Sequence, residues 1–156
     1  MANEKTNVMR ILDQNRIPYT AHCYDSALTD GVSVARAVGK DPASVFKTLV
    51  TVGNDLCHYI FVVPVEHTLN LKKAAAAVGV KSVEMIRQKE LFPLTGYVHG
   101  GCSPIGMKKP FCTVIDETAI LFDEITLSAG KVGRQVSLAP GALASLVHAA
   151  FADLTA

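Results

Sequence analysis

The sequence predicts a mixed α/β fold: a single domain over residues 1–156, with a curved mixed β-sheet, barrel-like at its core, flanked by helices. Segments with helical spacing of apolar residues are intermixed with runs of β-branched and aromatic residues. These elements follow no regular βαβ repeat. Apolar residues make up 49% of the 156, which is enough for one substantial core.

Capping and turn residues divide the first half of the chain. Thr6 or Asn7 can cap a first helix, Gly39 ends a second, and Asn70 and Gly79 bracket a third. The turn Gly53-Asn54-Asp55 separates two β-rich runs, which we expect to form a hairpin. The expected elements are helices over 6–16, 32–38 and 71–78, and strands over 19–24, 45–52 and 58–65.

The second half is richer in glycine. Pro93 is expected to end a short helix over 87–91, and Ala139-Pro140-Gly141 to open a C-terminal helix. That helix has apolar residues at core spacing as far as Leu154. The other expected elements are strands over 80–86, 112–115, 124–127 and 136–138, a helical turn over 117–121, and glycine loops over 96–106 and 128–133.

Composition excludes several classes of function. A net charge of +1 gives no overall basic field for nucleic acid. The four cysteines form no CxxC pair and show no zinc-ligand spacing with the five histidines, so we expect free thiols and no metal. No apolar run is long enough to cross a membrane, and the polar start Met1–Lys5 lacks a signal-peptide core. We therefore expect a cytoplasmic protein without a membrane partner.

Lys47 is the first candidate site residue. It stands in the run 45–52, where side chains alternate between two faces, and it shares its face with Val45, Leu49 and Thr51. Lysine is almost never fully buried without a partner. Its ammonium group must therefore reach an acid, a solvent-filled cleft or an anionic ligand; an edge-strand lysine that reaches water is the simpler alternative.

The two glycine loops are the second candidate feature. Backbone N–H groups in such loops can bind a carboxylate or phosphate, or stabilise an oxyanion, although glycine loops are often only turns. The chain contains no GxSxG elbow, HExxH motif, P-loop or dinucleotide fingerprint. No histidine has a partner at useful spacing, and Cys102, inside a loop, is the one cysteine expected near a site. Lys47 and the loops together suggest a cleft that binds an anionic substrate and polarises a carbonyl.

An ordered set of motifs carries a family resemblance across essentially the whole chain. These are Phe46-Lys47-Thr48-Leu49, Leu71–Ala75, Gly79–Met85, Thr95–Gly106 and Ser128–Gly133. The set resembles the YbaK/EbsC-type trans-editing proteins, relatives of the editing domain of bacterial prolyl-tRNA synthetase. The stretch 29–35 is more similar to the EbsC branch.

The resemblance implies a free-standing deacylase without cofactor or metal, acting on cysteinyl-tRNA(Pro), the mischarged product of prolyl-tRNA synthetase. Cysteine and proline are close in size, so a synthetase pocket separates them poorly and a second site must edit. The partners implied are the acceptor end of tRNA(Pro) and, transiently, the synthetase. In such relatives the substrate's own thiol attacks its carbonyl.

The family's site residues can be placed on this chain. Lys47 matches the key lysine, expected to hold the terminal adenosine's phosphate or ribose and to orient the ester. The resemblance assigns substrate binding to one tyrosine and the two glycine loops, at Tyr24, Gly100, Gly101, Ser128 and Gly130. Core packing is the alternative for Tyr24.

Two departures leave specificity open. The loop Asp25–Gly31 is shorter than in the YbaK branch and lacks its aromatic residue, and Gln135 stands where some relatives have an acid, so we assign it no catalytic role. The alternatives are a deacylase for alanine or another small residue, with a bound water as nucleophile, and a non-catalytic module that binds tRNA ends or the synthetase.

Overall fold

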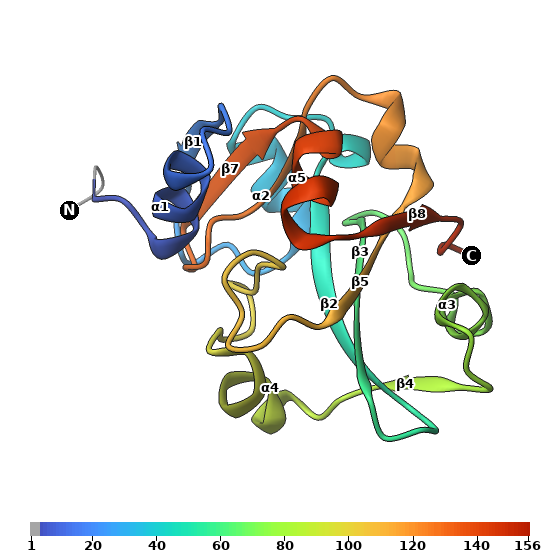
Figure 1. The fold of residues 1–156 in the computed structure, drawn as a ribbon. Coiled ribbons are helices and arrows are strands. Elements are labelled where there is room, and N and C mark those ends of the chain that lie inside the picture. Colours follow the sequence, from blue (N-terminus) through green and yellow to red (C-terminus); the bar gives the residue numbers. More distant parts are fainter. Residues whose placement is uncertain (1–3) are drawn as a thin grey trace.

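The computed structural model describes residues 4–156; residues 1–3, part of the polar N-terminal segment discussed above, lie outside the described residues. The helices are α1 (Asn7–Gln14), α2 (Gly31–Ala37), α3 (Leu71–Val78), α4 (Gln88–Thr95) and α5 (Pro140–Val147), with single 3-10 turns η1 (Pro42–Ser44) and η2 (Glu117–Leu121) (Figure 1). The strands are β1 (Thr20–Cys23), β2 (Phe46–Gly53), β3 (His58–Pro64), β4 (Val83–Met85), β5 (Cys112–Asp116), β6 (Ile125–Ser128), β7 (Arg134–Leu138) and β8 (Ala150–Ala152).

The strands form two sheets. The larger has the order β4-β2-β3-β5-β8 and the smaller the order β1-β7-β6. Strands β3, β5 and β8 pair in parallel, whereas β2 pairs antiparallel with both β3 and β4. A single parallel bridge between Val45 and Thr126 joins the two sheets. The mixed α/β class with a mixed sheet is therefore confirmed.

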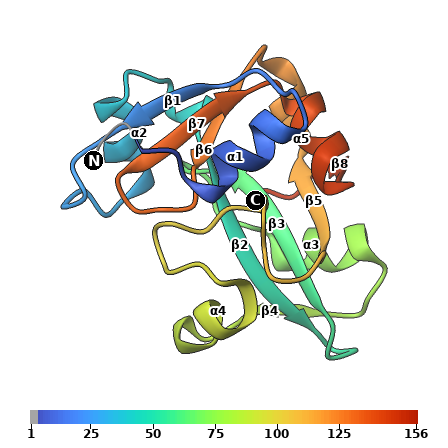
Figure 2. The same cartoon turned by 60° about the vertical axis from the view of Figure 1, so that its left-hand side comes forward.

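The sheets do not close into a barrel. Within residues 4–156 the outer strands β1 and β8 do not pair with each other. Helices α1 and α5 instead pack against the small sheet, and the largest apolar core lies between them (Figure 2). Leu12, Leu127, Val136 and Leu143 are fully buried in this core. The predicted fold class is therefore confirmed, although the barrel-like core is not a closed barrel.

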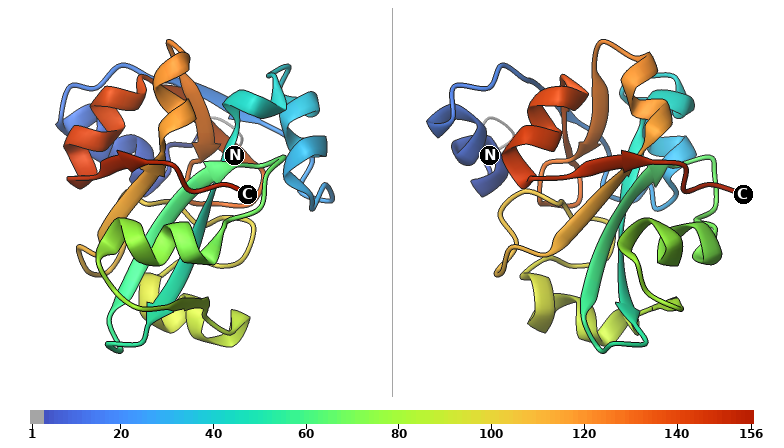
Figure 3. Two further views of the ribbon diagram at one scale, coloured as in Figure 1. Left: turned by 90° about the vertical axis from the view of Figure 1, so that its right-hand side faces the viewer. Right: turned by 45° about the vertical axis from the view of Figure 1, so that its right-hand side comes forward.

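A second core covers the other side of the larger sheet. Helix α3 lies across the strands of the β2–β3 hairpin in Figure 3, and its residues Ala74 and Ala75 pack against Phe61 and Val63. Alanine side chains let the helix approach the sheet closely. Lys73 on this helix binds Asp153 near the C-terminus, with 2.8 Å between Nζ and Oδ2.

Three elements differ most from the sequence-based expectation. The strand expected over 80–86 is shorter, Val83–Met85. Pro93 lies inside α4, which continues to Thr95 and ends at Gly96 in the left-handed conformation; a proline there removes one N–H donor but leaves the other turns intact. The C-terminal helix ends at Val147, because His148 adopts a left-handed φ of 55°, and β8 follows by pairing with β5.

Candidate active site

A cavity with a volume of about 440 Å³ lies between the two sheets and α4. It opens at an interruption in the edge of β2. That edge pairs with β4 only from Thr51 onward, and the bridge to β6 is at Val45, so within residues 4–156 no strand pairs with residues 46–50 on this side. The cavity is lined mainly by residues from the segments 24–34, 46–50, 85–91, 99–102 and 128–135.

Lys47 is in this cavity. Two residues after the Val45–Thr126 bridge, the parallel segments reach Lys47 and Ser128, whose side chains share one face because strand side chains alternate. Within residues 4–156 the Lys47 ammonium has no hydrogen bond or ion pair, and its partial burial lowers the pKa of the side chain below the usual value. The expectation that Lys47 reaches a cleft is confirmed.

The cavity lining carries an unusual balance of charge. None of its residues is an aspartate or a glutamate, and Lys47 is its one lysine or arginine among the described residues. Its apolar part includes Val34, Phe46, Val50 and Leu91. An ammonium group in such surroundings favours a ligand that supplies an oxygen acceptor or a negative charge.

The two glycine loops lie directly against each other. A Cβ atom on Gly101 would be 3.0 Å from the Val132 backbone nitrogen and 3.2 Å from the Lys131 carbonyl carbon. Gly100, with φ of +87°, lines the cavity beside Gly101. The absence of a side chain at Gly101 therefore allows the loops to form one continuous wall.

The second loop is held from inside the core. Ser128 Oγ accepts a hydrogen bond of 3.1 Å from the Gly130 N–H, and Ser128 lines the cavity. Gly130 has φ of +94°, and a Cβ there would be 3.0 Å from Val8 and 3.1 Å from the Tyr97 ring. Of the predicted site residues, the structure thus places Tyr24, Lys47, Gly100 and Ser128 on the cavity wall and the other two glycines behind it.

The loop Asp25–Gly31 contributes another wall of the cavity. The Tyr24 N–H donates to the Gly133 carbonyl at 2.9 Å, which ties the start of this loop to the second glycine loop. Asp30 caps α2 through the Ser33 N–H at 2.8 Å. Leu28 and Gly31 line the cavity, and a Cβ on Gly31 would be only 2.6 Å from Val65. Tyr24 belongs to this wall and is only partly buried.

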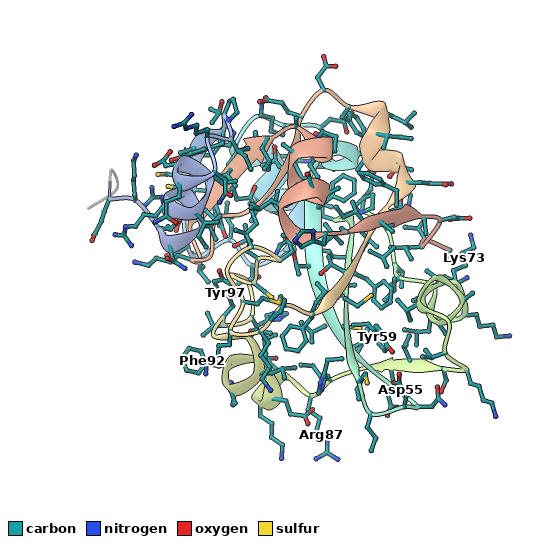
Figure 4. All side chains as sticks on the ribbon, in the orientation of Figure 1. Asp55, Tyr59, Lys73, Arg87, Phe92 and Tyr97 are labelled. Carbon is teal, nitrogen blue, oxygen red and sulfur yellow. The ribbon has the colours of Figure 1, made fainter. Side chains whose placement is uncertain are left out.

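Helix α4 closes another side of the cavity. It contributes Gln88 and Leu91 to the cavity lining. Arg87, just before the first turn of the helix, and Phe92, on its outer face, point away from the body of the protein (Figure 4). Phe92 is 56% exposed, and the Lys108 Nζ lies 5.4 Å from its ring centre. The Phe92 ring and the Lys108 ammonium group thus lie together on the outer side of α4, beside the cavity.

The sequence analysis assigned no site role to two residues of the cavity that carry buried polar atoms. Thr48 and Gln135 both line it, and the Thr48 Oγ1 and Gln135 Oε1 atoms are buried without a hydrogen-bond partner in the described part of the chain. The alternation along β2 placed Thr48 on the face away from Lys47, but the cavity wraps around the open strand edge. Gln135 is directly opposite Ser128 in the β6–β7 register, a pairing that only the fold shows.

Cys102 also lines the cavity, as expected from its place in the first glycine loop. Burial raises the pKa of its thiol to about 12, so the group stays protonated at neutral pH. Among residues 4–156, no three His, Cys, Asp or Glu side chains are grouped so that they could hold a metal ion. In the same part of the chain, none of the helices has the length and apolarity needed to cross a membrane.

Comparison with known proteins shows the family to which the chain belongs. The family model described as "Aminoacyl-tRNA editing domain" matches residues 27–146, which include every cavity segment except Tyr24 and Ser26. The chain belongs to this editing-domain family. A curated protein from Enterococcus faecalis, EbsC, named as a candidate Cys-tRNA(Pro)/Cys-tRNA(Cys) deacylase, is 45% identical over 154 residues, covering 97% of this chain and 94% of EbsC.

Solved structures share the fold of this editing domain. A candidate trans-editing enzyme for prolyl tRNA synthetase superposes with a TM-score of 0.84 at 25% identity, covering 98% of this chain and 99% of the other. The hypothetical protein APE2540 superposes with a TM-score of 0.88 at 21% identity, covering 97% of this chain and all of the other, and it supports the fold alone. The resemblance inferred from the motifs is confirmed.

Proposed function

We propose that this protein is a trans-acting deacylase that hydrolyses the ester of mischarged cysteinyl-tRNA(Pro). The observation that carries the proposal is the cavity itself. It offers one unpaired ammonium group and no carboxylate, within the segment that matches the editing domain. The similarity to EbsC, which is named for Cys-tRNA(Pro) and Cys-tRNA(Cys), supports the choice of cysteine.

Lys47 holds the phosphate or ribose of the terminal adenosine and orients the ester. Its ammonium group is partly desolvated and has no acid partner in residues 4–156, so a ligand oxygen meets no competing ion pair. A hydrogen bond to a charged group contributes about 1.5–3 kcal/mol. The N–H group of Gly100 on the cavity wall is suited to the ester carbonyl, while Gly101, whose N–H donates to the Val98 carbonyl at 3.0 Å, and Gly130 keep the loops in place behind it.

The nucleophile is the thiol of the substrate. Its sulfur attacks the ester carbonyl carbon, the acyl–oxygen bond to the ribose breaks, and the thiol proton passes to the ribose oxygen. The resulting cyclic thioester then opens with water to give free cysteine. In support, Cys102 stays a neutral thiol because its pKa is raised to about 12. No Ser, Thr or Cys of the cavity wall is hydrogen-bonded to a histidine among the described residues.

The partners follow from charge and substrate class. With a net charge of only +1, the protein binds free tRNA weakly, mainly through the acceptor end. A transient complex with prolyl-tRNA synthetase supplies the mischarged tRNA, and the reaction takes place in the cytoplasm. Tight, sequence-specific binding of free tRNA at physiological salt would contradict this arrangement.

The test is hydrolysis of three esters of tRNA(Pro), those of cysteine, alanine and proline, by the purified protein. The proposal predicts rapid release of cysteine and slow release of alanine, which has no thiol, and of proline. Faster release of alanine than of cysteine would still indicate a deacylase, but one that is specific for alanine and uses water as the nucleophile. No release of any of the three, with active controls, would refute the deacylase and favour a binding module.

A further inference from the structure

Gln135 is a buried polar residue with an unfilled hydrogen-bonding requirement. It is 8% exposed, lies on β7, and pairs with Ser128 on one side and His22 on the other. Its Oε1 atom has no hydrogen-bond partner in residues 4–156, although the residue lines the cavity. A buried acceptor without a partner is costly to a folded protein, so such an atom at a cavity wall points to a ligand.

The register places Gln135 on the same face as two other residues of the cavity. Gln135 lies directly opposite Ser128 in the β6–β7 register, and Ser128 and Lys47 each stand two residues after the Val45–Thr126 bridge. Past this bridge no strand pairing between β2 and β6 continues among the described residues, so the cavity opens between Lys47 and the Ser128–Gln135 pair. An aminoacyl group in this opening can turn its carbonyl end toward Lys47 and its nitrogen toward Gln135.

The other polar groups of the cavity are less suited to accept a hydrogen bond there. Ser128 Oγ already accepts the Gly130 N–H. Ser26, Thr29 and His99 are exposed to solvent. Thr48 Oγ1 is the second buried oxygen without a partner in the described chain, but its side chain is on the opposite face of β2 from Lys47.

We propose that Gln135 determines specificity by accepting hydrogen bonds from the α-amino group of the bound aminoacyl ester. The inference rests on the proposed function for its substrate class. An ester of an α-amino acid presents a carbonyl oxygen, which needs donors, and an α-amino group, which needs acceptors. Lys47 and the glycine-loop N–H groups meet the first need, and the amide oxygen of Gln135 meets the second. Because the cavity lining has no carboxylate, no stronger acceptor competes.

The test measures binding, so that it does not depend on hydrolysis. The probe is the cysteinyl amide of 3′-amino-3′-deoxyadenosine, which cannot be cleaved as an ester, beside the same amide made with 3-mercaptopropionate, which lacks the α-amino group. Dissociation constants are measured by calorimetry for wild type, Gln135→Met and Gln135→Glu. Wild type is expected to bind the amine-bearing probe about tenfold more tightly.

The variants separate recognition from structure. Gln135→Met is expected to reduce the preference to about twofold or less, to leave affinity for the probe without the amine almost unchanged, and to melt at the same or a higher temperature. Gln135→Glu, which keeps an acceptor, is expected to retain the preference. An unchanged preference in Gln135→Met, an equal loss of affinity for both probes, or no preference in wild type would each overturn the inference. Selective probe binding without hydrolysis of cysteinyl-tRNA(Pro) would support the inference and refute the proposed reaction.

Discussion

Substituting alanine for Gly101 tests how closely the two glycine loops must approach each other. Gly101 is not among the glycines with positive φ, so alanine can adopt its backbone conformation and the effect is steric. The new Cβ would be 3.0 Å from the Val132 nitrogen and 3.2 and 3.3 Å from the Lys131 carbonyl carbon and Cα. All three atoms are backbone, so one loop must move by a few tenths of an ångström.

The expected cost follows from that movement. Overpacking of a well-packed site typically costs about 1–3 kcal/mol in unfolding free energy. A displacement of about 1 Å in an active site can reduce a rate by about 10²-fold, so we expect the smaller shift of this wall to lower deacylation by about tenfold. Unfolding free energy is measured by urea denaturation, and activity by release of cysteine from cysteinyl-tRNA(Pro).

Gly141→Ala is the matched control. Gly141 is exposed near the start of α5, and a Cβ there meets no atom within 4 Å. Alanine is favoured over glycine in a helix, so this variant should be unchanged or up to about 1 kcal/mol more stable, with full activity. If Gly101→Ala behaves like Gly141→Ala in both assays, the loops do not form the tight wall described here.

Three further predictions concern groups in or beside the cavity. Native protein treated with a thiol reagent at pH 8 should react quickly at the three exposed cysteines and slowly at Cys102, because burial raises its pKa to about 12; equal reactivity of all four would contradict the placement. Tyr97→Phe should cost about 1–3 kcal/mol in urea denaturation, since the Tyr97 hydroxyl donates to the buried Ile105 carbonyl; an unchanged midpoint would contradict that bond. For Lys47, burial lowers the pKa in the folded state, so folding is penalised at neutral pH and the penalty disappears as pH rises through the lowered pKa toward 10.5. Wild type should therefore gain stability relative to Lys47→Met in that alkaline window, and parallel curves would refute the assignment.

Local patterns predicted most helices and strands, because capping residues and side-chain alternation act over a few positions. Thr6 caps α1 and Asn70 caps α3, as the helix-start signals predicted. The end of α5 was missed because its apolar spacing continues to Leu154, which is fully buried but follows a strand. The turn at His148 and the pairing of β8 with β5 depend on distant contacts that local spacing does not contain.

The candidate site was predictable only in part. Lys47 stood out because a lysine in an apolar strand needs an explanation, and the loops because of their glycines. The cavity itself depends on the bridge between Val45 and Thr126, which are far apart in sequence. Beyond that bridge the edge of β2 stays open, and the β6–β7 register places Ser128 opposite Gln135, so Gln135 could not be recognised as a site residue from its neighbours in the chain.

The most direct test of the central claim is single-turnover release of cysteine from cysteinyl-tRNA(Pro) by wild type and Lys47→Met, with unfolding free energies measured on the same samples. The account predicts that the rate of the variant is lower by at least about tenfold, because the variant lacks one charge-assisted hydrogen bond to the substrate. Its stability should equal or exceed that of wild type, because methionine keeps the apolar stem and removes an ammonium without a partner in residues 4–156. A variant that is stable and fully active would contradict the claim that this cavity is the deacylation site.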